Sequence, residues 1–293
     1  MPMAAANGIE IAYETFGSRA HHPLLLIMGL GAQMVLWDDD FCAQLADREH
    51  FVVRFDNRDV GHSTKLDAAG LPDMGALMMA MMTGQPVVAP YTLVDMAADA
   101  VGLLDALDVD AAHVVGASLG GMIAQTVAIE HPHRVRTLTS IMSTTSDRSL
   151  PPATPEAMNA LMSPPPAGRD EAIERAVEVF RVIGSKAFDI EEDRIRKVAG
   201  VQWDRGIHPE GVARQFAAIL AAGSRRQALA NVSVPTLVIH GSDDPLVPVA
   251  AGIDTAESIP GANLLVIDGM GHDYPRAVWP RIIDAIAGLT HGS

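Results

Sequence analysis

The chain contains one cysteine, Cys42, among 293 residues, so it cannot form an intramolecular disulfide. A lack of disulfides is typical of proteins that fold in a reducing compartment. Residues 1–8 have neither the cationic start nor the apolar stretch of a secretory signal. No run of roughly 18 or more apolar residues is free of polar interruptions, so no membrane span is predicted. We therefore expect a cytoplasmic protein.

Basic residues are scarce relative to acidic ones. Lys and Arg number 21 and Asp and Glu number 36, which gives a formal net charge of −15. Because such a charge repels phosphate, nucleic acids and anionic membranes are not expected partners. The spacings of His, Cys and acidic residues that hold metal ions are missing, and so is a phosphate-binding loop. The sequence therefore predicts no metal and no cofactor.

What the sequence does contain is a series of short apolar runs separated by helical patterns. Runs that are apolar throughout indicate strands buried on both faces, which is typical of a parallel sheet. Residues 8–16 alternate between apolar and polar, and predict an antiparallel edge strand. The expected parallel strands are residues 24–28, 51–55, 113–117, 138–142, 236–239 and 264–267.

Amphipathic stretches lie between these runs, with apolar residues that repeat at the helical period. Strands and helices that alternate in this way predict an α/β protein with right-handed crossovers and a doubly wound, mostly parallel sheet. The expected helices are residues 37–46, 93–107, 122–130, 250–259 and 275–289.

The longest break in this alternation spans residues 146–231. A structureless loop of that length is uncommon in a compact domain, and the segment carries helical patterns after a proline-rich start. We expect it to form a helical cap, or lid, inserted after the sixth strand. The core would then consist of residues 1–145 and 232–293.

A second break, at residues 66–90, is rich in methionine. Four of these methionines are too closely spaced to lie on one narrow helical stripe: Met78, Met79, Met81 and Met82. Because methionine is flexible and polarisable, we expect some of these side chains to reach a cleft as part of an adaptable lid. The alternative is that they pack the cap onto the core.

A glycine-flanked serine stands at the end of one expected strand. Residues 116–120 read Gly-Ala-Ser-Leu-Gly, which matches the G-x-S-x-G nucleophile elbow. The turn must be tight to raise the serine above the sheet, and Gly116 and Gly120 remove side chains that would clash there. The helix that follows directs its positive amino end at the site. We therefore expect Ser118 to be the catalytic nucleophile.

A serine hydroxyl is a weak nucleophile and needs a base, which in turn needs an acid to orient it. With this elbow, the acid follows the serine in the chain and the histidine comes last. Asp243 and Asp244 follow the strand at residues 236–239, and we choose Asp244 because it directly precedes the proline. In the alternative, Asp243 is the acid and Asp244 caps the next helix. His272, the only histidine at the end of the last strand, is the expected base.

The tetrahedral intermediate of acyl transfer needs two hydrogen-bond donors aimed at its oxygen. The backbone N–H of Leu119, directly after the nucleophile, is one expected donor. The loop after the strand at residues 24–28 should supply the other. Its glycines, Gly29 and Gly31, let the chain turn and leave the N–H of Leu30 facing the site.

With these residues in place, the chain resembles the α/β-hydrolase superfamily along nearly its whole length. Residues 55–63 resemble the D-x-R-x-x-G-x-S segment that follows the fourth strand in that family, where it gives structural support. Residues 235–248 and 269–272 resemble the acid and base loops of small capped bacterial hydrolases. The resemblance implies the α/β-hydrolase fold. Met28-Gly29 replaces the His-Gly common at the oxyanion loop, and because the donor is backbone we expect activity to survive.

The hydrolases that the chain resembles include carboxylesterases, polyketide methylesterases, lactonases, C–C bond hydrolases and cofactor-free haloperoxidases. A serine at the elbow argues against haloalkane dehalogenases and epoxide hydrolases, which carry aspartate there. The resemblance implies a serine esterase that cleaves a small hydrophobic carboxylic ester through an acyl-enzyme intermediate. The alternatives are a lactonase, a C–C bond hydrolase, a haloperoxidase or a non-catalytic ligand receptor on the same fold. No pattern indicates an oligomeric state.

Because no metal-binding pattern is present, ester turnover should not depend on metal ions. Dialysis against EDTA, followed by assay with a chromogenic short-chain ester, should leave kcat/KM within about twofold of the untreated protein, since no Lewis acid is removed. A loss of activity that added Zn²⁺ or Mg²⁺ restores would contradict this expectation.

Overall fold

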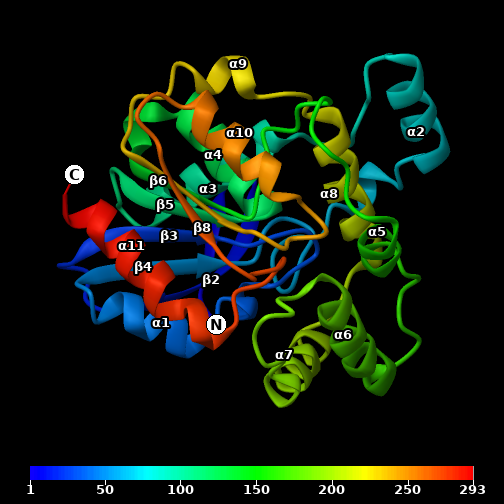
Figure 1. The fold of residues 1–293 in the computed structure, drawn as a ribbon, viewed down its shortest axis with the longest axis horizontal. Helices are drawn as coiled ribbons and strands as arrows, with labels where there is room; N and C mark the ends of the chain where they lie inside the picture. Colours follow the sequence, from blue (N-terminus) through cyan, green and yellow to red (C-terminus); the bar gives the residue numbers. More distant parts are fainter. Residues whose placement is uncertain (293) are drawn as a thin grey trace.

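One eight-stranded sheet forms the centre of the molecule, and the computed structural model describes residues 1–292 (Figure 1). The strand order is β1-β2-β4-β3-β5-β6-β7-β8. β2 pairs antiparallel with both β1 and β4, and all the other neighbours are parallel. The strands are β1 (Met3–Ala6), β2 (Ile9–Phe16), β3 (His22–Ile27), β4 (His50–Phe55), β5 (Ala112–Ala117), β6 (Val135–Ile141), β7 (Thr236–Gly241) and β8 (Asn263–Ile267).

Helices fill the connections between the strands. The α-helices are α1 (Asp39–Ala46), α2 (Met74–Thr83), α3 (Leu93–Ala106), α4 (Leu119–Glu130), α5 (Pro155–Leu161), α6 (Arg169–Ile183), α7 (Glu192–Asp204), α8 (Pro209–Ala221), α9 (Arg226–Leu229), α10 (Val249–Ser258) and α11 (Trp279–His291). Short 3₁₀ helices are η1 (Met34–Leu36), η2 (Asp67–Ala69), η3 (Pro132–Arg134) and η4 (Arg276–Val278). Within residues 1–292, no helix combines the length and the hydrophobicity that crossing a membrane requires.

The predicted α/β-hydrolase fold is confirmed, and each of the expected parallel strands overlaps an observed one. The predicted edge strand is antiparallel, as expected, but it is not at the edge of the sheet. It is β2, and the shorter β1 pairs along its outer side. β1 has only four residues, three of them alanine, and because alanine is depleted in strands the segment carries no strand signal in the sequence.

Both faces of the sheet are covered by helices, as the central strand β3 illustrates. Leu25 and Ile27 belong to a core cluster shared with α3 and α4 on one face. Leu24 and Leu26 belong to a second cluster shared with α1 and α11 on the other. All four side chains are fully buried. Burial on both faces is why the strands are apolar throughout, without the alternation of a half-exposed sheet.

Helices α5–α9 form an insertion between β6 and β7, which we call the cap segment (Figure 1). Within it, α6 packs against α7, and α8 lies beside α2 of the methionine-rich region. Met79 on α2 is 61% exposed, and the side chains of Met78, Met81 and Met82 lie outside the described residues. The methionine lid, like the domain boundaries at residues 146 and 231, therefore stays a prediction.

Four histidine rings are in contact near the amino ends of β3, β4 and β5: His22, His50, His113 and His291. His50 is fully buried, and its Nδ1 donates to the carbonyl of Leu45 over 2.9 Å. His113 is also buried. Burial lowers the pKa of both buried rings, and lowers that of His113 to about 3. Both are therefore neutral in the folded protein at neutral pH.

The buried histidines should make folding stability fall in mild acid. An unfolded histidine has a pKa of about 6.5, so below this pH His113 is protonated in the unfolded chain but stays neutral in the folded protein. Stability is then complete above pH ~6.5 and declines as the pH falls towards 3. At pH 5, His113 alone should cost up to about 2 kcal/mol of the unfolding free energy.

Urea unfolding at pH 7.5 and pH 5.0 measures this loss. His113→Gln should reduce the pH dependence, whereas His133→Gln, which changes an exposed histidine, should not. An equal loss of stability with pH in the wild type and in His113→Gln would show that His113 does not carry the effect.

Candidate active site

Ser118 stands at the turn where β5 ends and α4 begins. Its backbone has φ 56° and ψ −120°, in a region that L-residues rarely occupy. A Cβ added at Gly116 would lie 2.0 Å from the carbonyl oxygen of Gly120, and one added at Gly120 would lie 2.0 Å from that of Ile27. Both positions therefore require glycine. The strained turn projects the serine hydroxyl away from the sheet at the amino end of α4.

The structure brings Ser118, His272 and Asp244 together from the loops after β5, β8 and β7. His272 Nε2 lies 3.0 Å from Ser118 Oγ, and its Nδ1 lies 2.7 Å from Asp244 Oδ2. Asp244 accepts only, so His272 carries its proton on Nδ1 and leaves Nε2 free to accept from the serine. The other carboxylate oxygen, Oδ1, accepts the N–H groups of Leu246 and Val247 at 2.9 and 2.8 Å.

Asp243, the alternative acid, does not contact the histidine. Its side chain is exposed, and its Oδ1 accepts from the Ser242 hydroxyl at 2.7 Å. Asp244 is 5% exposed, and the residue that caps α10 is Pro248. Of the two aspartates that the sequence left open as the acid, Asp244 is therefore the one that contacts His272.

The loop that carries His272 is held by the cap segment. The backbone N–H of His272 donates to the carbonyl of Ile183 at 2.7 Å, and the N–H of Gly271 donates to Ser185 Oγ at 2.9 Å. Asp273 Oδ1 accepts from the N–H of Ser185 at 2.9 Å, and burial raises the pKa of Asp273. Sequence reasoning did not find Ile183 or Ser185. Their contacts involve the end of a cap helix almost ninety residues before the base, and no local motif marks them.

The expected oxyanion loop lies against the nucleophile. A Cβ added at Gly29 would lie 3.3 Å from Ser118 Cβ, so the chain after β3 passes beside the serine. Gly31 has φ +63°, which a glycine adopts without strain. Within residues 1–292, neither the N–H of Leu30 nor that of Leu119 has a hydrogen-bond partner. Both N–H groups are therefore available to a ligand.

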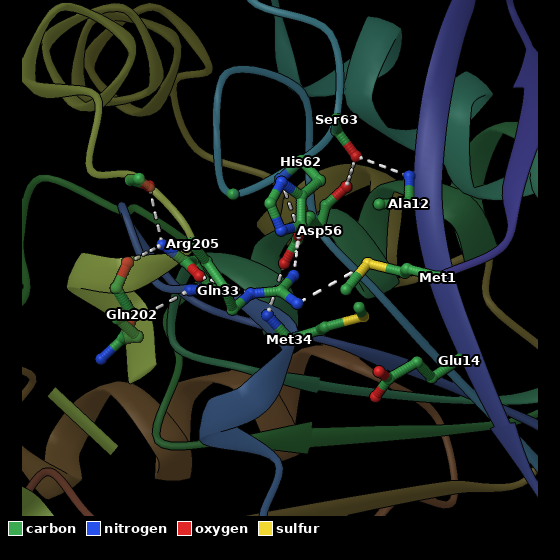
Figure 2. A network of polar contacts seen from close by, with 12 residues as sticks. Met1, Ala12, Glu14, Gln33, Met34, Asp56, His62, Ser63, Gln202 and Arg205 are labelled. Carbon is green, nitrogen blue, oxygen red and sulfur yellow. Dashed lines mark hydrogen bonds and ion pairs between the residues drawn. The ribbon is translucent and has the colours of Figure 1, made fainter. Parts of the chain in front are cut away.

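The ion pairs behind this loop connect it to the cap segment. Asp56, which follows β4 and is fully buried, pairs with Arg205 at the end of α7 (Figure 2). Arg205 also donates from Nε to the side-chain oxygen of Gln33 at 2.7 Å. A second buried pair joins Arg214 of α8 to Asp59, with a closest approach of 2.7 Å. Two arginines of the cap segment thus form ion pairs with the segment after β4, close to the expected oxyanion loop.

A cavity of about 280 Å³ opens at Ser118 and His272. Its wall is mostly apolar and comes from the core and the cap segment together, with Phe180 and Phe216 on the cap side. Four methionines contribute to it, and none of them is among the four that the sequence analysis expected to reach a cleft: Met28, Met122, Met142 and Met158. A larger, open pocket of about 1070 Å³ is lined by many charged residues and does not include the serine or the histidine.

The described residues 1–292 hold no group of three or more His, Cys, Asp or Glu side chains arranged to bind a metal ion. A serine that is hydrogen-bonded to a histidine, which is paired in turn with a buried carboxylate, can transfer an acyl group, and free backbone N–H groups beside the serine can stabilise an oxyanion.

Residues 22–274 match the model of the alpha/beta hydrolase fold family. The chain is 31% identical to the rhodomycin D methylesterase DauP of Streptomyces sp. (strain C5), over 99% of this chain and 98% of that protein. It is 29% identical to the putative carbamate hydrolase RutD of Azorhizobium caulinodans, over 97% of this chain and 96% of that protein. The meta-cleavage product hydrolase CumD of Pseudomonas fluorescens IP01 has the same fold, with a TM-score of 0.75 at 19% identity over 100% of this chain and 98% of that one.

The two adjacent aspartates should differ sharply in their effect on turnover. Asp244→Asn removes the acceptor that fixes the His272 tautomer, and should lower kcat by about 10³–10⁴-fold. Asp243→Asn changes an exposed side chain and should alter kcat by less than about threefold. Initial rates with one ester, on variants with unchanged thermal melting, provide the comparison. Equal losses, or the reverse order, would overturn the choice of acid.

Proposed function

Because the chain belongs to the α/β hydrolase fold family, we propose that it is a serine esterase, with Ser118 as nucleophile, His272 as base and Asp244 as the orienting acid. The observation that carries the proposal is the pair of contacts on His272, 3.0 Å to the serine oxygen and 2.7 Å to the carboxylate. They meet at the mouth of a largely apolar cavity. A non-catalytic receptor on this fold would have no need for that alignment.

In the proposed reaction, Ser118 Oγ attacks the ester carbonyl carbon while its proton passes to His272 Nε2. Asp244 stabilises the imidazolium that forms. The carbonyl oxygen becomes an oxyanion that accepts from the N–H groups of Leu30 and Leu119. When the intermediate collapses, the C–O bond to the alcohol breaks and His272 returns the proton to the departing oxygen. Water then attacks the acyl-serine by the same steps, releasing the acid and restoring the serine.

The lining of the cavity supports an uncharged, hydrophobic acyl group. A charged substrate would lose hydration against Phe180, Phe216 and the four methionines, which make up much of the wall. Among the described residues, Arg194 is the one arginine or lysine that lines the cavity, so an anionic group elsewhere in it would have no counterion. A volume of about 280 Å³ is at the lower end of ligand cavities, which favours a compact acyl group. Resemblance to a methylesterase over nearly the full length of both chains supports an ester with a small alcohol.

Replacing the nucleophile tests the proposal directly. Ser118→Ala should lower kcat for short p-nitrophenyl esters by about 10⁵–10⁶-fold, because the acyl acceptor is lost. Intact-mass analysis after treatment with a p-nitrophenyl phosphonate should show one adduct on the wild type and none on Ser118→Ala. Ser163→Ala, which changes an exposed serine in the cap segment, is the matched control and should be labelled like the wild type.

A substrate panel tests the acyl preference. Methyl esters of neutral hydrophobic acids should have a higher kcat/KM than monomethyl esters of dicarboxylic acids of similar length, which carry a free carboxylate. Lactones and C–C substrates are assayed beside them. Near wild-type turnover by Ser118→Ala would refute the mechanism. A higher rate on a lactone or a C–C substrate would retain the triad and reassign the substrate.

A further inference from the structure

One cap side chain makes a direct contact with the backbone of the oxyanion loop. Gln215, on α8, is fully buried. Its Oε1 accepts from the backbone N–H of Gly31 at 2.8 Å, and its Nε2 donates to the carbonyl of Arg58 at 2.9 Å. The two ends of one carboxamide thus bridge the loops after β3 and β4. Both polar ends of this buried side chain are satisfied, which is the condition under which a buried amide fixes a structure.

The helix that carries Gln215 lies very close to the same loop. A Cβ added at Gly31 would lie 2.8 Å from Val212, one turn earlier on α8. A Cβ added at Gly211 would lie 2.4 Å from the carbonyl oxygen of Asp59. α8 therefore lies close enough to the loops after β3 and β4 for the carboxamide of Gln215 to reach both of them.

The bonded N–H is one residue beyond the proposed oxyanion donor. The N–H of Gly31 belongs to the peptide plane that joins it to Leu30, and the N–H of Leu30 belongs to the plane before it. Peptide units are rigid and share the Leu30 Cα, so fixing one restricts the direction of the other. On the other side, the Asn57 side chain donates to the carbonyl of Met28 at 2.9 Å. The chain is thus held on both sides of the Leu30 N–H.

We propose that Gln215 is a positioning residue for catalysis, which holds the Leu30 N–H in the direction of the developing oxyanion. The proposal rests on the proposed esterase function. Donors lower the barrier to acyl transfer when they are fixed before the charge appears. A loop released from α8 would still admit substrate to the cavity, but its donor would be misplaced when the tetrahedral intermediate forms. Losing this contact should therefore reduce kcat far more than it raises KM.

Gln215→Met is the main test, because methionine fills a similar space without either polar end. We expect kcat for a p-nitrophenyl ester to fall by about 10–100-fold, with KM within about threefold of the wild type. The rate of Ser118 phosphonylation should fall by a similar factor. In that reaction Oγ bonds to phosphorus as its proton passes to His272 Nε2, p-nitrophenolate leaves, and the phosphoryl oxygen occupies the oxyanion hole.

Val212→Ala is the matched control on the same helix. It removes packing against Gly31 but no hydrogen bond, and should change kcat by less than about threefold. Gln215→Glu retains an acceptor for the Gly31 N–H and loses the donor to Arg58, so its kcat should exceed that of Gln215→Met by at least about fivefold. If the methionine variant does not fold, Gln215→Asn, an amide too short to reach Gly31, takes its place in the comparison.

The proposal is overturned if the folded methionine or asparagine variant keeps kcat within threefold of the wild type. It is also overturned if Val212→Ala loses as much kcat, or if KM rises while kcat and phosphonylation stay unchanged. Failure of the esterase function itself gives a different result. In that case the wild type neither turns over esters nor reacts with the phosphonate at Ser118, whatever residue stands at 215.

Discussion

The site depends on a close approach of bare backbone at the elbow. The end of β3, the end of β5 and the first turn of α4 pass so near one another that glycine is required at residues 116 and 120. This closeness brings the serine hydroxyl, the free N–H of Leu119 and the oxyanion loop into one small volume. The acid and base loops after β7 and β8 then need only reach that point from neighbouring parallel strands, whose carboxyl ends share an edge of the sheet.

The cap segment does more than enclose the cavity, because it also contacts the backbone of the loops that carry His272 and Leu30, residues of the proposed site. Ile183 accepts from the N–H of His272, and Gln215 accepts from the N–H of Gly31. Arg205 and the fully buried Arg214, paired with Asp56 and Asp59, attach the same segment to the core nearby. Breaking a buried ion pair is costly because one charge is left without a partner, so these pairs strongly favour a single placement of the cap. The cavity wall and the catalytic loops are therefore set by the same packing.

The fold and the centre of the site could be predicted from local patterns, since two-sided burial makes strands such as β3 continuously apolar and a tight elbow restricts residues 116–120 to a recognisable motif. β1 was missed because it is short and mostly alanine, which does not favour strands. Gln215 could not be found this way, because it lies 184 residues from Gly31 and its role depends on how α8 packs. The methionines in the cavity wall come from separate loops and helices, so their convergence is a property of the tertiary structure alone.

β6 and β7 are neighbours in the sheet, and the cap segment leaves from one and returns to the other. Because these strands are parallel, the insertion runs from the carboxyl end of β6 to the amino end of β7, and it can be lengthened, shortened or exchanged without altering strand pairing. Such exchanges would replace one wall of the cavity at once and shift the range of substrates. An incoming segment would still have to supply acceptors for two backbone N–H groups of the catalytic loops. A different cap could thus change the cavity wall and keep the geometry of these loops, provided that it kept these few contacts.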